Sequence, residues 1–269
     1  MNTRIPMIVN WPATWSKIQT FEKCPWEFYL KEGSKFITGK AEIPFATNKY
    51  MQRGEQKHDL YEQAAFSISN GCSIPDKTRQ HPLWNDYVGN IITNLMAIYP
   101  NVSIEEKFGI DFDWRVWSVN KYWEPDKSLF DNRMMFLRTK LDLILLNADR
   151  WKEPTHAVVI DYKSGKARKA EACGQLGLYA LTAFCRWPSL QRVDCHYIFV
   201  DHNSRQDEVY YSWNVPDLKA YFVDRILKIH RYLQSASTQI PFNDCNPSDQ
   251  NCYWCPADVN QCPHYKVAF

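Results

Sequence analysis

The stretch that decides the fold is Val158-Val159-Ile160-Asp161-Tyr162-Lys163-Ser164-Gly165, an apolar run that ends in an acid, an aromatic residue and a base. Its length and composition are typical of a buried strand, which would hold the residues after it rigidly. Because side chains alternate across a strand, we expect Asp161 and Lys163 on one face and Tyr162 on the other. Asp-x-Lys alone is common at solvated strand ends, so the rest of the chain must decide what the pair does.

A second acid lies in an earlier apolar run. Residues 136–146 have the pattern of a strand, Asp142 stands between Leu141 and Leu143, and a turn signal follows over residues 147–150. A carboxylate in such a run is costly to bury unless it is paired or bound to a metal ion. If the two strands pair, Asp142 and Asp161 can share a cation, with Lys163 offsetting negative charge, as metal-assisted phosphodiester hydrolysis requires.

Predicted helices supply further polar side chains. Gln175 and Tyr179 are four residues apart in one helical stretch, which places them on one face. Another helical stretch begins near Gly54 and offers His58 as a ligand. An amphipathic helix is expected over residues 216–236. Glu105 and Glu106 precede a strand-like run; they can supply an auxiliary acid, but we interpret them as a solvated pair.

The cysteines form a second pattern. There are nine, and Cys252-x-x-Cys255 followed by Cys262 has the spacing of metal ligands. Cys245 lies just upstream, so these four thiols can form a local zinc site, with His264 as a substitute ligand. Free thiols in a reduced chain are the remaining interpretation.

The ordered set Gly54-x-x-x-His58, Asp142, Asp161-x-Lys163 and Gln175-x-x-x-Tyr179 resembles the RecB-like branch of the PD-(D/E)XK nuclease superfamily. Residues 15–30 are similar to the N-terminal helix of that branch, and the resemblance runs from about Trp15 to Cys262. It implies a restriction-endonuclease-like α/β core, a short mixed sheet flanked by helices, with N-terminal helices and a Cys-rich tail. One domain is implied over residues 1–269, with its catalytic core at about 50–200 and a clasp from residues 15–30 and 245–265.

The resemblance also implies cofactors. In the iron–sulfur relatives, the AddB-type nuclease domains and the CRISPR-associated RecB-like exonucleases, the fourth cluster ligand is the Cys-Pro cysteine of the N-terminal helix. That residue is Cys24 here, which implies a [4Fe–4S] cluster held by Cys24, Cys252, Cys255 and Cys262. Zinc on the local cysteines is the alternative.

Catalytic roles follow from the same resemblance. It implies three ligands for one or two Mg²⁺ or Mn²⁺ ions: His58, Asp142 and Asp161. Lys163 is expected to orient a water or stabilise the phosphate, and Gln175 and Tyr179 to hold the substrate or the groups around the site.

The activity so implied is an exonuclease acting on single-stranded DNA ends with 5′→3′ polarity, in phage recombination or replication or in CRISPR adaptation. The alternative from another class is a DNA-end-binding adaptor subunit of a larger complex, and oligomers or partner proteins suit either. A sequence-specific endonuclease would need a recognition element, which we do not find. The chain also has no Gly-x-x-x-x-Gly-Lys-Ser/Thr phosphate loop, which favours a stand-alone nuclease or a subunit without its own helicase.

Composition adds limits. The formal net charge of +2 gives no global attraction to nucleic acid, so a DNA groove must be local, with Lys163, Lys166, Arg168 and Lys169 as the best candidates. No segment has the length and apolarity of a membrane span, and an odd number of cysteines fits a reducing cytosol better than a disulfide framework. We therefore expect an intracellular protein of a phage or a prokaryotic host.

Overall fold

The chain divides into two compact units. The first comprises residues 1–46, 134–137 and 220–269, and the second residues 47–133 and 138–219. All the acids, amides and bases predicted to do chemistry belong to the second unit, and the predicted metal-binding cysteines belong to the first. The computed structural model describes residues 12–41, 43, 49–119, 135–149, 151–165, 172–237, 245–246, 252, 255, 257 and 261–262.

A six-stranded mixed sheet forms the centre of the second unit. Its order is β2-β1-β3-β4-β5-β6. β4 and β5 are parallel, and the pairs β1–β2, β3–β4 and β5–β6 are antiparallel. The prediction of a short mixed sheet flanked by helices is confirmed. The strands are β1 (Asn101–Asp111), β2 (Val116–Ser118), β3 (Met135–Leu146), β4 (His156–Lys163), β5 (Arg192–Phe199) and β6 (Ser204–Tyr211).

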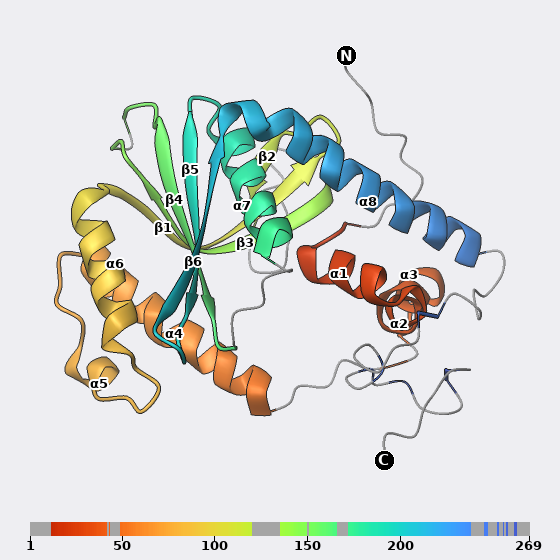
Figure 1. Ribbon diagram of the computed structural model, residues 1–269, viewed down its shortest axis with the longest axis horizontal. Coiled ribbons are helices and arrows are strands. Elements are labelled where there is room, and N and C mark those ends of the chain that lie inside the picture. Colours follow the sequence, from red (N-terminus) through yellow and green to blue (C-terminus); the bar gives the residue numbers. More distant parts are fainter. Residues whose placement is uncertain are drawn as a thin grey trace. The chain divides into compact units, whose positions relative to one another are not determined.

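Helices cover both faces of this sheet (Figure 1). On one face α7 (Ala172–Arg186), which makes the crossover between the parallel strands β4 and β5, packs Leu176 and Ala180 against Val159. On the other face α4 (Lys49–Ser69) and α6 (Asp86–Ile98) pack against Val158 and Ile160, and the short α5 (Asp76–Arg79) lies between them in the chain. Because β4 is covered on both sides, its apolar residues form a continuous run instead of alternating with polar ones.

Side-chain alternation changes phase in two neighbouring strands. Leu141 packs in the core beside α7, whereas Leu143 packs in the core beside α4 and α6, although strict alternation would place both on one face. In β1 the same change separates Ile104, beside α4, from Phe108, beside α7. Between these two residues Glu105 has a left-handed φ of 55°. One extra residue in each strand, a β-bulge, produces such a shift, and bulges re-aim the side chains next to functional sites.

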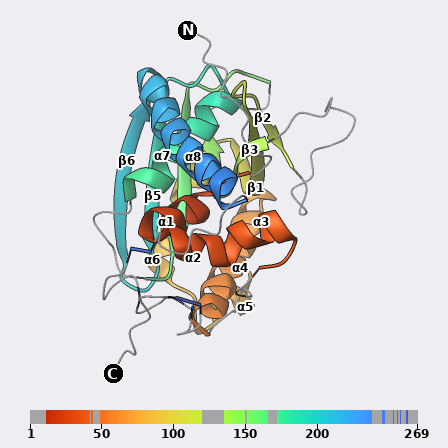
Figure 2. The same ribbon diagram turned by 90° about the vertical axis from the view of Figure 1, so that its right-hand side faces the viewer.

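The described part of the first unit is mainly helical, and it also includes the start of β3, where Leu137 forms a β-bridge with Ala13. Figure 2 shows α1 (Trp15–Lys23), α2 (Pro25–Phe28) and α3 (Ser34–Thr38) close together, and the π-helical turn η1 (Tyr29–Gly33) connects α2 to α3 in the chain. The hydroxyl of Thr14 caps α1 by accepting from the Lys17 amide. Trp15 contacts Phe222 of α8 (Val215–Ala236) with ring centroids 6.4 Å apart. The predicted amphipathic helix over residues 216–236 is confirmed. The predicted helix over residues 15–30 is confirmed in part, since the extended backbone of Cys24 separates α1 from α2.

A short 3-10 turn, η2 (Ser212–Asn214), leads from β6 into α8. In the described part of the chain, no helix combines the length and the apolarity needed to cross a membrane.

Candidate active site

Asp142 in β3 is joined to His58 in α4. The His58 Nδ1 lies 3.1 Å from the Asp142 Oδ2, and the backbone N–H of Tyr162 donates to the same oxygen at 3.0 Å. Burial alone would raise the pKa of Asp142, but the hydrogen bond and charge of His58, the Tyr162 amide and the charge of Lys163 outweigh it and hold the pKa below its usual range. Asp142 is therefore a buried carboxylate that stays ionised.

The same contact changes the proton affinity of His58. Burial lowers the pKa of this imidazole, but the hydrogen bond to Asp142 and the charges of Asp142 and Asp161 leave it raised above 6.5. Without a metal ion, His58 and Asp142 form a charged pair over a wider pH range than a free histidine would. A metal ion that binds this imidazole must first displace its proton.

Glu105 completes a compact set of ligand atoms. One atom each of His58, Glu105 and Asp142 lies within 4.8 Å of the other two. An imidazole nitrogen with two carboxylates suits Mg²⁺ or Mn²⁺, with a modest preference for Mn²⁺, so these residues fit the metal. Our expectation of a solvated Glu105–Glu106 pair is wrong for Glu105, whose side chain is 18% exposed and forms an ion pair with Lys140. Burial raises the pKa of Glu105, and Lys140 opposes that rise.

Asp161, at the end of β4, belongs to a second group of side chains. The Tyr179 hydroxyl donates to its Oδ1 at 2.5 Å, and the Lys163 Nζ forms an ion pair with its Oδ2 at 2.6 Å. Gln175 connects the others: its amide donates to Tyr179 at 2.5 Å, and its Oε1 accepts from Lys163 at 3.0 Å. Burial, together with the charge of Asp142, raises the pKa of Asp161 even though Lys163 opposes the rise.

The structure thus brings together most of the predicted site. Asp161 and Lys163 share one face, as expected, and so do Gln175 and Tyr179. Asp161 interacts electrostatically with Asp142, but its oxygens are not part of the compact set that contains His58. The predicted ligands therefore divide between two groups, which interact electrostatically through Asp142 and Asp161.

Tyr197 in β5 is a site residue that the sequence did not reveal. It stands opposite Asp161 in the parallel register of β4 and β5. Its hydroxyl donates to the Gln175 Oε1 at 3.1 Å, and the Lys163 Nζ lies 5.0 Å from the centroid of its ring. Nothing in the sequence around Tyr197 indicates this role, because the register that places the ring near Lys163 is a long-range property.

In the first unit, cysteines from both ends of the chain gather. Cys24, Cys245, Cys255 and Cys262 pack against one apolar cluster, and the Cys245 and Cys262 sulfurs are 4.0 Å apart. Burial, with Cys262 nearby, raises the pKa of Cys245 to about 12. Among the described residues no three thiols have their sulfurs within 4.8 Å of one another. Cys252 meets this group through its carbonyl, which accepts from the Cys255 amide at 3.2 Å.

Some predicted residues cannot be placed. Lys166, Arg168, Lys169 and His264 lie outside the residues that the structure describes, so the basic stretch after β4 and the substitute zinc ligand remain predictions.

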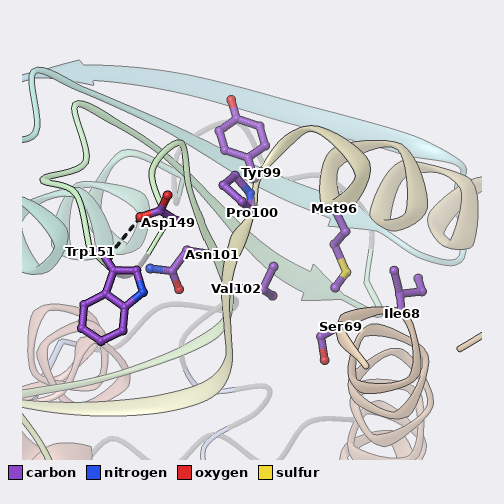
Figure 3. Close-up of a pocket in the computed structure, with 9 residues that line it drawn as sticks. All are labelled: Ile68, Ser69, Met96, Tyr99, Pro100, Asn101, Val102, Asp149 and Trp151. Atoms are coloured by element: carbon purple, nitrogen blue, oxygen red, sulfur yellow. Dashed lines mark hydrogen bonds between the residues drawn. The ribbon is translucent and has the colours of Figure 1, made fainter. Parts of the chain in front are cut away.

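A separate surface pocket of about 520 Å³ lies where β1 begins, beside the ends of α4 and α6 (Figure 3). Its α4 residue Ile68 is ten positions beyond His58, about 15 Å further along the helix. None of the predicted catalytic residues lines it. Its lining residues are Ile68, Ser69, Met96, Tyr99, Pro100, Asn101, Val102, Asp149 and Trp151.

A family model and a solved structure each match most of the chain. A comparison with curated proteins found no match. Among solved structures, the chain is similar to the one named "Crystal structure of SSO0001", with 14% sequence identity, a TM-score of 0.28 and coverage of 76% of this chain and 77% of that chain. The family model for the PD-(D/E)XK nuclease superfamily matches residues 12–263, a range that includes both groups of side chains described above. The chain therefore belongs to the PD-(D/E)XK nuclease superfamily.

Proposed function

We propose that this protein is a metal-dependent DNA exonuclease that hydrolyses phosphodiester bonds from single-stranded ends with 5′→3′ polarity. Membership of the superfamily implies phosphodiester hydrolysis with a divalent metal ion. The observation that carries the proposal is that two groups lie within electrostatic range of one another: the ligand set His58, Glu105 and Asp142, and the Asp161–Lys163 pair. Single-stranded ends, polarity and a setting in phage recombination, replication or CRISPR adaptation rest on the RecB-like resemblance alone.

In the proposed mechanism, each group has a separate task. His58, Glu105 and Asp142 would hold Mg²⁺ or Mn²⁺, and Asp161, whose charge interacts with that of Asp142, would be a further ligand. When bound, the ion lowers the pKa of a coordinated water and withdraws charge from the scissile phosphate.

Lys163 stands beside this site and offsets the negative charge that develops on the phosphate. Gln175 and Tyr197 fix the position of its ammonium group, and Tyr179 fixes the carboxylate of Asp161. Held in this way, these groups need little rearrangement during the reaction, which is how positioned side chains lower a barrier.

We also propose a [4Fe–4S] cluster on Cys24, Cys252, Cys255 and Cys262. Its support is the gathering of thiols from both chain ends in one apolar cluster, together with the ligand spacing. Protein purified without oxygen should be brown, with broad absorption near about 400 nm that Cys24→Ala removes. Colourless protein with one zinc ion that survives Cys24→Ala would favour the local site that includes Cys245.

The activity is tested with single-stranded DNA labelled separately at each end, in Mn²⁺, Mg²⁺ or EDTA. Release of short labelled products from the 5′ end alone, and only with metal, supports the proposal. Asp161→Ala should abolish cleavage while the protein stays folded, and cleavage that persists in this variant would remove the active-site assignment. Binding of DNA ends without cleavage by metal-loaded wild-type protein would favour the adaptor function instead.

A further inference from the structure

Glu105 is held in a backbone conformation that its side chain disfavours. Its φ of 55° is left-handed, which crowds the Cβ of any residue except glycine. Glutamate gains nothing locally from this conformation, unlike asparagine or aspartate, which make short-range hydrogen bonds there. Such a conformation persists only where surrounding structure fixes it, and it is found mainly at functional sites. Here it coincides with the phase change in β1, and the Glu105 carboxylate lies near His58 and Asp142.

Lys140 already supplies a positive charge to this carboxylate. It lies two residues before Asp142 in β3, and its Nζ forms an ion pair with Glu105. The charges of Asp142 and of Glu62 in α4 also act on Lys140. The ammonium group therefore pairs directly with Glu105, one member of the ligand set that a divalent ion would use, and lies within the electrostatic range of two further carboxylates.

We infer that Lys140 is an internal substitute for the divalent ion: it pairs with Glu105 in the metal-free protein and releases Glu105 when metal binds. The inference rests on the proposed function only in that the site takes Mg²⁺ or Mn²⁺. The exchange is electrostatically reasonable because a divalent ion carries twice the charge and can also be held by His58 and Asp142. The lysine stem is flexible, and the Lys140 side chain is 40% exposed, so the ammonium can move into solvent.

The exchange has a measurable consequence. Metal binding must break the Lys140–Glu105 ion pair, so Lys140 lowers the affinity of the site for metal. Lys140→Met keeps the aliphatic stem and should tighten Mn²⁺ binding by roughly tenfold, the scale on which neighbours of metal ligands act. Glu105→Gln should weaken binding by a similar factor. In the double variant the effect of Lys140→Met should disappear, because the group that Lys140 protects is gone.

Mn²⁺ titrations followed by calorimetry and by the electron paramagnetic resonance of free Mn²⁺ measure this cycle. Lys140→Arg is the matched control, since it retains the positive charge and should leave the Mn²⁺ affinity closer to that of wild type than Lys140→Met does. Unchanged or weaker Mn²⁺ binding by Lys140→Met, with the variant folded, would overturn the inference. The inference would also be overturned if Lys140→Met changed the Mn²⁺ affinity by the same factor in the wild-type and the Glu105→Gln proteins.

The release itself can be followed on the unmodified protein. An amine-reactive ester, with peptide mass spectrometry, should label Lys140 several-fold faster in Mg²⁺ than in EDTA, because the ion pair no longer covers the amine. Lys152, which is 77% exposed and lies in the turn between β3 and β4, should react equally in both. Equal labelling of Lys140 in both buffers would contradict the exchange.

These readouts do not depend on DNA. If DNA cleavage is normal but Lys140→Met does not change the affinity for Mn²⁺, the role proposed for Lys140 is wrong and the nuclease proposal stands. If the Mn²⁺ affinities change as predicted but the protein does not cleave DNA, the role of Lys140 is supported and the nuclease proposal is wrong.

Discussion

The strained backbone at Glu105 predicts a reversal of an ordinary stability order. At a regular strand position alanine is more stable than glycine by about 0.5–1 kcal/mol, because glycine loses more conformational freedom on folding. At a left-handed φ of 55°, alanine instead incurs a steric cost of about 1–2 kcal/mol that glycine avoids. Both Glu105→Ala and Glu105→Gly remove the carboxylate and its ion pair with Lys140, so those losses cancel in the comparison. Glu105→Gly should therefore be the more stable of the two by about 0.5–1 kcal/mol.

Thermal unfolding in EDTA measures this difference without a contribution from bound metal. For a protein of this size, 1 kcal/mol corresponds to about 2–4 °C, so the glycine variant should melt about 1–4 °C above the alanine variant. Val209 in β6 provides the control, since it is a partly exposed strand residue whose φ is not left-handed. At this position Val209→Ala should be more stable than Val209→Gly. If Glu105→Ala proves equal to or more stable than Glu105→Gly, the conformation at residue 105 is not strained and the reasoning fails.

Three further perturbations test the surroundings of the site. Tyr197→Leu removes the ring beside Lys163 and should lower kcat in steady-state assays by about tenfold, while the affinity for Mn²⁺ stays unchanged. The kcat of Tyr197→Phe should lie between those of wild type and Tyr197→Leu. Lys57→Met removes the buried ammonium group that pairs with Asp201, a residue whose side chain is 32% exposed. The free energy of unfolding measured in urea should therefore fall by about 1–2 kcal/mol. Because the pKa of His58 is raised in the folded protein, protonated His58 contributes to the stability of the metal-free protein. This contribution is fully present below pH 6.5 and is lost as the pH rises through the folded-state pKa. Unfolding free energies of wild type should therefore fall over that range relative to His58→Gln.

Much of the fold could be predicted because its signals are local. The apolar run before Asp161 has the length of a strand, and the residues between 216 and 236 repeat with helical spacing. An acid inside the apolar run of β3 is costly unless paired, which correctly indicated a polar partner for Asp142. Each of these inferences needs only neighbouring residues and the period of one element.

The remaining site residues depend on relations between strands. Glu105 has no distinctive sequence context, and it becomes a candidate ligand only through the phase changes in β1 and β3. Tyr197 reaches Lys163 because β5 lies parallel to β4 in one particular register. A one-residue shift would send either side chain to the opposite face, and nothing in either segment alone fixes the register.

The two aspartates illustrate what the environment adds to a motif. Both are buried acids, yet the pKa of Asp142 is lowered by His58 and the Tyr162 amide, whereas burial and the charge of Asp142 raise that of Asp161. Asp142 is therefore ionised first, and Asp161 is the carboxylate whose proton must leave before it can serve as a metal ligand.

After Lys163, Tyr179 also assists that step, because its hydroxyl donates to the Asp161 Oδ1 at 2.5 Å and so favours the ionised form. Tyr179→Phe should raise the pKa of Asp161 further and move the acid limb of the pH–rate profile to higher pH. The comparison variant is Tyr162→Phe, which removes a buried hydroxyl in the core beside α4, on the other face of β4, and should leave the limb in place. An acid limb that stays fixed or moves to lower pH in Tyr179→Phe would mean that ionisation of Asp161 does not limit the reaction. Asp142 would then supply the essential carboxylate by itself.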